Sequence, residues 1–438
     1  MPSDIYADLS WRGLIHQSTD ERALAEWLRT GSRVLYVGFD PTADSLHVGS
    51  LLPLMLLRRF QRAGHRPIAL VGGATGMIGD PSGKSEERKL LSSEILQLNV
   101  TGIERQMRQF LDFDGPSAAT LVNNYDWMKG YGYIEFLRDV GKNFPVNGML
   151  AKDSVRSRLE RDDAGLSYTE FSYMLLQAYD FVHLHDRYGC QLQAGGSDQW
   201  GNITAGIDLA RRMRGAQLYG MTCPLLLNSE GEKIGKTEKG TKVWLSAERT
   251  SPYQFYQYWR NLPDADAGRC LRYLTEIVPQ EIEALDESRS REPDQRHSQI
   301  RLAEALTVQV HGTAGLEAAQ RATRVLFGEA LDDLEASQLL EIFADVPSVE
   351  LPRQVLDGEG LGLLDAMVSA RLAGTKGEAR RTVEQGGAYV NNRRVTPELQ
   401  RLTPELLVGG SLIVLRSGRK KYGLLRFVAS SEPTSFRD

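Results

Sequence analysis

Two short polar motifs, far apart in the chain, carry residues that could handle phosphate groups. The first is His47-Val-Gly-Ser50, which directly precedes the apolar run 51–60. A helix that begins near Ser50 points its free backbone N–H groups and the positive end of its dipole toward His47 and Gly49, which favours a bound anion. An imidazole can donate to a phosphate oxygen, and a glycine lets a ligand approach the backbone. On spacing alone, a helix-capping histidine beside a turn glycine is an equally good interpretation.

The second motif is Lys233-Ile-Gly-Lys-Thr237, within the polar, glycine-punctuated segment 228–240. Such a segment is typical of a mobile loop. A lysine loop is by default a solvated surface, but mobile lysines can also close over a leaving pyrophosphate as its negative charge grows.

A third set of polar side chains shares one face of a predicted helix, residues 166–184. Tyr173, Gln177 and Asp180 follow the spacing i, i+4, i+7, so a phenol, an amide and a carboxylate point the same way. An ordinary solvent-exposed helix surface is the alternative. Asp198 follows a glycine turn, where it could accept hydrogen bonds from ribose hydroxyls or stabilise a helix N-terminus.

Parallel strands alternating with helices must position these groups. Residues 34–42 and 67–71 are predicted strands on either side of the helix that begins near Ser50 and stops near Gly64. A glycine-rich loop, residues 72–84, follows the second strand. Further strands are predicted at 119–122, 190–200 and 224–227. This pattern predicts an α/β, Rossmann-like parallel-sheet domain whose ligands bind at the carboxyl ends of the strands.

The 438 residues are too many for one ordinary domain. We expect a catalytic domain at 1–245, an α-helical domain at 246–345, a glycine- and proline-bearing linker at 346–360 and a small α+β module at 361–432. In the module, a helix at 363–372 and a second helix after the capping-box pattern Thr375-Lys-Gly-Glu378 precede a hairpin at 386–395 and paired strands at 411–416 and 422–428.

Charge is distributed unevenly along the chain. Residues 361–438 hold ten Arg and three Lys against seven acidic residues, a net charge of +6, which leaves −11 for the rest. This asymmetry favours a polyanionic partner for the basic module, although a solvated basic surface is the alternative. Three widely spaced cysteines favour reduced thiols and a cytoplasmic setting, without a metal site. No apolar run approaches the roughly 20 residues of a membrane span.

The segment Tyr36-Val-Gly-Phe-Asp-Pro-Thr-Ala-Asp-Ser-Leu-His47, with Val-Gly-Ser50 after it, resembles the first signature of class I aminoacyl-tRNA synthetases and specifically the bacterial tyrosyl-tRNA synthetases. That signature ends in histidine in its full form. Ser50 replaces it here and could still donate to a phosphate or cap the helix. Lys233-Ile-Gly-Lys-Thr237 resembles the second signature, Lys-Met-Ser-Lys-Ser, and the terminal module resembles the S4-type RNA-binding fold.

The resemblance implies a ligase that activates L-tyrosine with ATP, releases pyrophosphate and transfers tyrosine to the 3′-terminal adenosine of tRNA(Tyr). It also implies a cytoplasmic homodimer, with Mg²⁺ accompanying ATP and no protein-bound metal. The catalytic residues would be His47, Ser50, Lys84, Lys233, Lys236 and Thr237. Tyrosine would be bound by Tyr36 and Asp180 at the phenol, by Tyr173, Gln177 and Asp80 at the ammonium group, and by Asn124 and Gln193. ATP or the adenylate would be bound by Gly38, Asp40, Thr42, His47, Gly49, Asp198, Gln199 and Lys236.

In the basic module, cations on a helix, a hairpin and a turn have the placement expected for RNA-backbone contact. They are Lys376, Arg380, Arg381, Arg393, Arg394, Arg419, Lys420 and Lys421. Two rival functions fit part of this pattern. A different nucleotidyltransferase has no evident need for the basic module or the pair Tyr36–Asp180. A non-catalytic RNA-binding protein would be favoured by loss of His47 or the two signature lysines, and all three are present.

Overall fold

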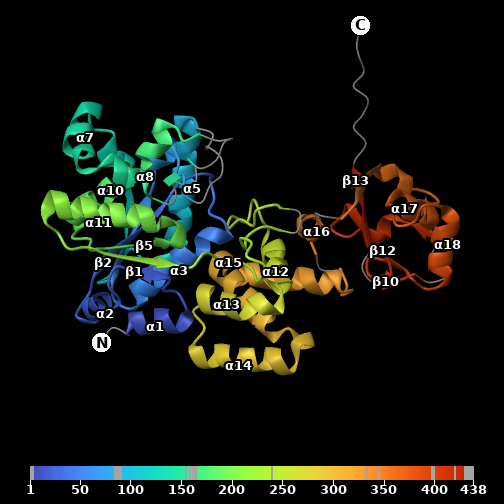
Figure 1. Ribbon diagram of the computed structural model, residues 1–438. Coiled ribbons are helices and arrows are strands. Elements are labelled where there is room, and N and C mark those ends of the chain that lie inside the picture. The colour runs from blue at the N-terminus through green and yellow to red at the C-terminus, as the bar shows by residue number, and fades with distance from the viewer. Residues whose placement is uncertain are drawn as a thin grey trace, which may run out of the picture. The chain divides into compact units, whose positions relative to one another are not determined.

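The computed structural model describes residues 4–82, 91–152, 155–156, 159, 165–237, 240–331, 334–343, 346–395, 400–418 and 421–428. Lys84, Arg419 and Lys420 lie outside the described residues. The chain divides into two compact units: the first contains residues 1–250 and 255–312, and the second contains residues 251–254 and 313–438. Figure 1 shows the elements of each.

The first unit is built around a six-stranded sheet with the order β1-β6-β5-β2-β3-β4. Its strands are β1 (Gln17–Ser18), β2 (Val34–Phe39), β3 (Arg66–Val71), β4 (Thr120–Asn123), β5 (Leu192–Gly196) and β6 (Tyr219–Cys223). β1 pairs antiparallel with β6, and the other neighbours are parallel. The strand predicted at 224–227 is wrong, because the ladder ends one residue earlier: Pro224 has no N–H to contribute to it.

Helices connect and cover these strands. They are α1 (Ile5–Arg12), α2 (Glu21–Arg29), α3 (Val48–Arg62), α4 (Thr75–Ile78), α5 (Ser93–Phe110), α6 (Tyr125–Met128), α7 (Tyr133–Asp139), η1 (Gly141–Asn143), α8 (Val146–Leu150), α10 (Tyr168–Tyr188), η2 (Ser197–Gln199), α11 (Trp200–Arg214), α12 (Pro252–Arg260), α13 (Asp264–Leu274), α14 (Pro279–Arg291), η3 (Pro293–Gln295) and α15 (His297–Leu326). α15 is interrupted at Gly312, whose φ of +73° suits glycine, and the two units divide there.

Side chains alternate across the central strands, and both faces of the sheet are covered. Tyr36 and Ile68 point to the face that packs on α10, where Phe181 is fully buried. Leu35 and Ala69 point to the opposite face and are fully buried too, while α3 and α5 pack against β2 and β3. A parallel sheet buried on both faces is the α/β architecture predicted from the sequence, so the fold class is confirmed.

The second unit contains a five-stranded sheet with the order β10-β9-β12-β13-β7 and a two-stranded sheet, β11-β8. Its elements are α16 (Ala336–Ile342), β7 (Ser348–Pro352), η4 (Arg353–Leu356), β8 (Leu361–Gly362), α17 (Leu363–Ser369), α18 (Lys376–Glu384), β9 (Ala388–Val390), β10 (Arg393–Arg394), β11 (Arg401–Leu402), η5 (Pro404–Leu406), β12 (Leu412–Ser417) and β13 (Lys421–Val428). As the capping-box pattern predicts, the Thr375 side chain accepts from the backbone N–H of Glu378, at 3.2 Å.

Residues 346–360, which were expected to form a linker, belong to this second unit. β7 pairs in parallel with β13, and Leu356 is buried in the same core as Ile413. The prolines that suggested a linker are tolerated because β7 is an edge strand, where a missing N–H breaks no ladder. Upstream, Val325 and Leu339 share a core with Leu412, so the end of the predicted helical domain also packs into this unit.

Candidate active site

A cavity of about 480 Å³ lies at the carboxyl ends of β2 and β5. Here β2 leads through α3 to β3 on one side and is paired with β5 on the other, which is the switch point where open α/β sheets bind ligands. Of the predicted site residues, the cavity is lined by Tyr36, Gly38, Asp40, Thr42, His47, Gly49, Ser50, Asp80, Tyr173, Gln177, Asp180, Gln193, Asp198, Gln199, Lys233 and Lys236. Asn124 and Thr237 lie outside its lining.

The buried end of the cavity is formed by Tyr36 from β2 and Asp180 from α10. Each residue is only 1% exposed. Within the described part of the chain, the Tyr36 hydroxyl has no hydrogen-bond partner, and burial raises the pKa of Tyr36 well above its usual value. A buried hydroxyl without a partner costs free energy, so a ligand group that hydrogen-bonds to it would be stabilised.

Two donors hold the Asp180 carboxylate. The Asn124 amide donates to Oδ2 at 3.0 Å, and the Trp127 indole N–H donates to Oδ1 at 2.9 Å. Burial raises the pKa of Asp180 to about 7, although both hydrogen bonds act to lower it. Trp127 was not predicted as a site residue. The available signal was its position just after β4, at the carboxyl edge of the sheet.

Asp40 lies beside this buried end and is held by two hydroxyl donors. Tyr173 donates to Asp40 Oδ2 at 3.0 Å, and Thr75 donates to Oδ1 at 2.9 Å. Gly72, the first residue of the glycine-rich loop, makes this arrangement possible, because a Cβ there would lie 2.3 Å from both Asp40 Oδ1 and Thr75 Oγ1. This glycine therefore makes room for a carboxylate and its donor.

A chain of amides lines the middle of the cavity. Gln199 donates to Asp80 Oδ2 at 2.7 Å, and Gln177 donates to Gln199 Oε1 at 3.3 Å. The buried Oε1 of Gln193 accepts no hydrogen bond from the described residues. Tyr173 and Gln177 line the same cavity as Asp180, as expected if the three side chains share one face of α10.

The N-terminus of α3 forms the other end of the cavity. His47 caps the helix, with Nδ1 accepting the Gly49 backbone N–H at 2.9 Å. A neutral imidazole whose Nδ1 accepts carries its proton on Nε2, so the ring keeps a donor. The capping and phosphate-binding interpretations of His47 are therefore compatible. Gly49 is needed here because a Cβ would lie 2.7 Å from His47 Cε1.

The second signature loop lies against this helix end. The Gly235 backbone N–H donates to the Tyr258 hydroxyl at 2.8 Å, and a Cβ at Gly235 would lie 3.4 Å from the Gly49 nitrogen. Lys233 and Lys236 flank this buried glycine and are exposed. Lys242 also lines the cavity, although it was not predicted. Thr237 is part of a turn, in which its backbone N–H donates to the Thr241 carbonyl at 2.8 Å.

In the second unit, the described cations of the predicted tRNA-binding set are exposed: Lys376, Arg380, Arg381, Arg393, Arg394 and Lys421. Lys376 pairs with Asp365 at 2.5 Å. Arg394 Nε donates to the Gly386 carbonyl at 2.8 Å, and Lys421 Nζ donates to the Leu372 carbonyl at 3.1 Å. Arg380 and Arg381 lie on α18, and Arg393 and Arg394 form β10.

Three further features concern metal ligands, thiols and membrane-spanning helices. Within the described ranges, no group of three or more His, Cys, Asp or Glu side chains could hold a metal ion. Cys190, Cys223 and Cys270 are buried free thiols. No helix in the described part of the chain is both long and apolar enough to span a membrane.

Known families and relatives match nearly all of the chain. The family "tRNA synthetases class I (W and Y)" matches residues 29–328, and the "Tyrosine--tRNA ligase SYY-like C-terminal domain" matches residues 338–425. A tyrosine–tRNA ligase from Rhodopirellula baltica is 62% identical over 424 residues, covering 97% of this chain and 96% of the relative. One from Geobacillus stearothermophilus is 48% identical over 426 residues, covering 97% of this chain and 100% of the relative.

The fold of this chain is similar to solved structures of aminoacyl-tRNA synthetases. A C-terminally truncated mitochondrial tyrosyl-tRNA synthetase from Aspergillus nidulans has a TM-score of 0.67 and 30% identity, covering 74% of this chain and 94% of its own. A Plasmodium falciparum tryptophanyl-tRNA synthetase, 14% identical with a TM-score of 0.52, covers 77% of this chain and 87% of its own and shares the fold. With two family matches and relatives of high identity along almost its whole length, the chain belongs to the tyrosyl-tRNA synthetase family of class I aminoacyl-tRNA synthetases.

Proposed function

We propose that this cavity carries out both steps of tyrosine–tRNA ligation. The tyrosine carboxylate attacks the α-phosphorus of ATP and pyrophosphate leaves. A ribose hydroxyl of the terminal tRNA adenosine then attacks the tyrosyl carbonyl and AMP leaves. No side-chain nucleophile is needed, so the protein supplies positioning and charge stabilisation. The supporting observation is a single cavity that joins a buried phenol-and-carboxylate pair to a helix N-terminus and exposed lysines.

At the buried end, Tyr36 and Asp180 would bind the substrate phenol. The phenol would donate to the Asp180 carboxylate, and the unpartnered Tyr36 hydroxyl would gain a partner. Phenylalanine would leave the buried Tyr36 hydroxyl without a partner and would offer no donor to the Asp180 carboxylate, so it should be rejected. Asn124 would act by fixing the carboxylate, as its contact with Asp180 suggests.

In the middle of the cavity, Tyr173, Gln177 and Asp80 would bind the substrate ammonium group, and Gln193 would bind nearby. An ammonium offers three donors, and a carboxylate, an amide oxygen and a phenol oxygen are suitable acceptors. The Asp80 carboxylate is 7% exposed and already oriented by Gln199, which supports a preformed site.

At the open end, the N-terminus of α3 and the second signature loop would bind ATP. His47 Nε2 and the helix N-terminus would contact phosphate, and Lys233 and Lys236 would stabilise the charge that develops on pyrophosphate. Ser50, Thr237 and Lys84 are assigned to the same step. Gly38, Asp40, Thr42, Gly49, Asp198 and Gln199 would contact the nucleoside portion and the adenylate.

Mg²⁺ would accompany ATP, held mainly by phosphate and water. Asp40 and Asp80 each already accept at least two hydrogen bonds from the described residues, which fits a site without a protein cage for the ion. Bound there, the ion would neutralise charge on the phosphates.

The basic residues of the second unit would bind the tRNA(Tyr) backbone. A homodimer is proposed from the exposed apolar side chains Tyr133, Ile134, Val146 and Tyr168 on α7, α8 and α10, since such exposure favours a protein interface. The buried free thiols support a reducing compartment, and we propose the cytoplasm.

Pyrophosphate exchange is the direct test. The purified chain should exchange labelled pyrophosphate into ATP only when L-tyrosine is present, and phenylalanine or tryptophan at the same concentration should not replace it. Charging of tRNA(Tyr) should then follow. Exchange with an amino acid other than tyrosine, or none with any, would contradict the proposal.

A further inference from the structure

We infer that Arg59 is a positioning residue for ATP, although it lies at the end of α3 remote from the cavity. Together with Arg12, it fastens that end of α3 to the last turn of α13, and so fixes where the N-terminus of α3 lies in the cavity. The inference rests on the proposed assignment of His47 and Gly49 to ATP.

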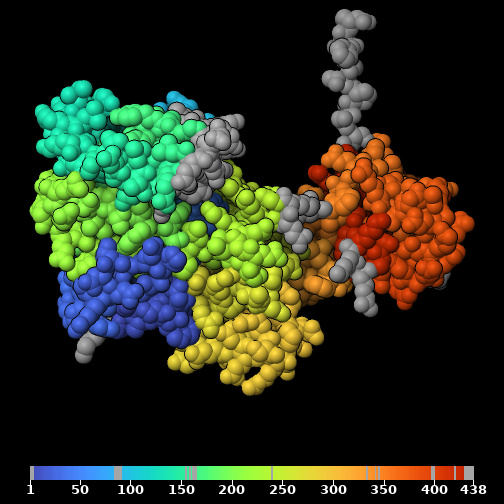
Figure 2. Space-filling view, viewed as in Figure 1, coloured from blue at the N-terminus to red at the C-terminus, as the bar shows by residue number. Residues whose placement is uncertain are grey.

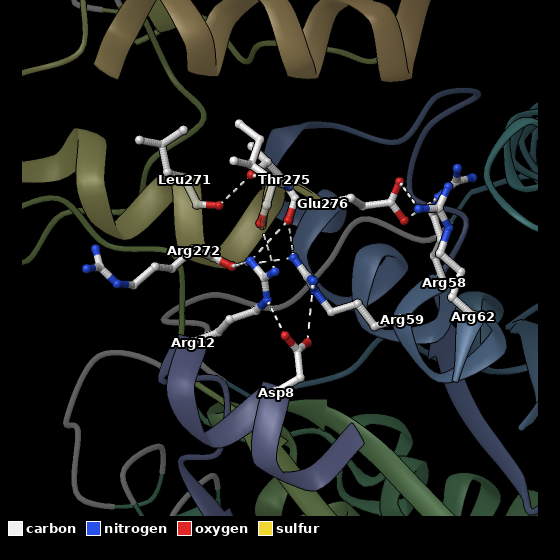
Figure 3. A network of polar contacts seen from close by, with 10 residues as sticks. Asp8, Arg12, Arg58, Arg59, Arg62, Leu271, Arg272, Thr275 and Glu276 are labelled. Carbon is white, nitrogen blue, oxygen red and sulfur yellow. Dashed lines mark hydrogen bonds and ion pairs between the residues drawn. The ribbon is translucent and has the colours of Figure 1, made fainter. Parts of the chain in front are cut away.

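Two arginines share the same backbone acceptors, as Figure 3 shows. Arg12 donates to the carbonyls of Arg272, at 3.2 Å, and Thr275, at 3.4 Å, and also to Ile277, at 2.9 Å. Arg59 donates to the Arg272 carbonyl at 3.4 Å and to the Thr275 carbonyl. The last carbonyls of a helix lack partners within it and lie at its negative end, so cations stabilise them.

The two guanidinium groups are buried and share one carboxylate. Arg12 is 4% exposed and Arg59 is 6% exposed. Asp8 lies 2.9 Å from Arg12 and 3.6 Å from Arg59. Burial, and then repulsion by Arg12, lowers the pKa of Arg59 to about 10, which still leaves it charged at neutral pH. Because a buried charge must keep its partners, the position of Arg59 relative to α13 is tightly specified.

A second pair of contacts holds the same end of α3. Arg58 and Arg62 pair with Glu276 at 2.9 and 2.8 Å, and Arg58 also donates to the Phe110 carbonyl at 2.6 Å. Figure 3 shows Arg58, Arg59 and Arg62 all reaching toward the segment after α13. In Figure 2, the blue N-terminal segment adjoins the yellow segment around α14 on the surface of the first unit.

The rest of α3 carries this constraint to the cavity. Arg59 is twelve residues after His47, about 18 Å along the helix axis. At the cavity end, the Val48 backbone N–H donates to the Val243 carbonyl at 3.0 Å, and Gly235 packs against Gly49. A shift at the arginine end would therefore move the phosphate-facing groups and the surface on which the lysine loop lies. The groups assigned to the tyrosine phenol, Tyr36 and Asp180, belong to β2 and α10 and would stay in place.

The test separates ATP parameters from tyrosine binding. Arg59→Met keeps the aliphatic stem but removes every donor. We expect adenylate formation at subsaturating ATP to fall about 10-fold to 100-fold, the range for small displacements of reacting groups. The tyrosine Kd should stay within twofold. Arg59→Lys, which keeps the charge but lacks the planar fork, should recover part of the loss.

Arg62→Met is the matched control, because Arg62 is on the same helix and is 57% exposed, and Arg58 keeps the contact of α3 with Glu276 when Arg62 is lost. It should behave as wild type. Equal losses for ATP and tyrosine in Arg59→Met, or wild-type ATP parameters in that variant, would overturn the inference. If Arg59→Met does not fold, Glu276→Gln should raise the ATP KM two- to threefold, and an unchanged value would overturn it.

Wild-type tyrosine-dependent exchange is measured first. Its absence would refute the proposed function, whereas its presence with an unaffected Arg59→Met variant would refute only the role of Arg59.

Discussion

The two ends of the cavity differ in burial and in how their polar groups are paired. At the end proposed to bind tyrosine, called the tyrosine end below, Tyr36 and Asp180 are 1% exposed, and both oxygens of Asp180 already accept from protein donors. At the end proposed to bind ATP, called the nucleotide end below, Lys233 and Lys236 are exposed on either side of a buried glycine. A buried, prearranged end is suited to discriminating between similar amino acids. An open, cationic end is suited to stabilising the negative charge that develops on pyrophosphate. Specificity and rate should therefore respond to different substitutions.

The largest expected effect is at the tyrosine end. Asp180→Ala would remove the acceptor of the Trp127 indole and of the substrate phenol. It would also remove one of the two acceptors of the Asn124 amide, which donates to Thr75 Oγ1 as well. At about 1–3 kcal/mol for each unpaired buried group, kcat/KM for tyrosine should fall about 1,000-fold or more. Pyrophosphate exchange at varied tyrosine measures this.

Asp186→Ala is the control, because Asp186 is on the same helix but forms an exposed ion pair with Arg214. It should be nearly silent. Circular dichroism must show that both variants are folded. Near-normal exchange by a folded Asp180→Ala protein would exclude Asp180 from phenol recognition.

The next effect is at the nucleotide end. Lys236→Ala should slow adenylate formation about 100-fold, the typical cost of removing one group that stabilises transition-state charge. The tyrosine Kd should change less than threefold, since the lysine would act after tyrosine is bound. Single-turnover kinetics with equilibrium tyrosine binding separate the two quantities. Glu230→Ala, in the same loop but outside the cavity lining, is the control. A normal single-turnover rate for Lys236→Ala would remove it from the catalytic set.

A pH profile probes the same difference without mutation. In the proposed complex the substrate phenol donates to Asp180, and the ionised carboxylate is a stronger acceptor than the protonated carboxyl. Since burial raises the pKa of Asp180 to about 7, protonation below that value should weaken tyrosine recognition. Between pH 8 and pH 6, kcat/KM for tyrosine should fall about 10-fold, following the ionised fraction in the free enzyme. Asp180→Asn should lose this step. A profile without a step between pH 6 and pH 8 would mean that Asp180 stays ionised throughout.

The spacing of residues within one helix predicts some of the groups that line the cavity. His47 and Gly49, and the common face of Tyr173, Gln177 and Asp180, were found because helix geometry fixes which residues lie together. Trp127 was missed because its contact joins α6 to α10, 53 residues apart, and no local pattern encodes that pairing. The Arg59 contacts with the end of α13 were missed for the same reason.

The same limit explains the errors in the fold. Residues 346–360 have the prolines and glycines of a linker, yet β7 forms because β13, about 75 residues later, offers a sheet edge. The sequence predicts a strand at 224–227, whereas β6 is Tyr219–Cys223, because the leucines after Pro224 are more apolar than the residues of the strand. Local composition predicts elements well only where no distant partner decides the outcome.

The smallest expected effect concerns the second unit, whose cations would act on tRNA and not on the cavity. Arg380 and Arg381 are adjacent and exposed on α18. The double substitution Arg380→Gln with Arg381→Gln should weaken tRNA(Tyr) binding about fivefold. It should also make the slope of log K against log salt shallower by about 1.5, because each lost phosphate contact removes about 0.7–0.9 from it. Tyrosine-dependent pyrophosphate exchange should not change, since these residues take no part in it.

The matched double variant, Arg401→Gln with Arg426→Gln, removes the same charge from the same unit. Those arginines pair with Glu359 and Glu350, so they should contribute little to RNA binding. A general electrostatic effect of the basic unit predicts equal changes in slope for the two double variants. A specific surface predicts a change only for the α18 pair. If the α18 variant instead lowered exchange and tRNA charging in parallel, the second unit would be supporting the fold of the enzyme and not the capture of tRNA.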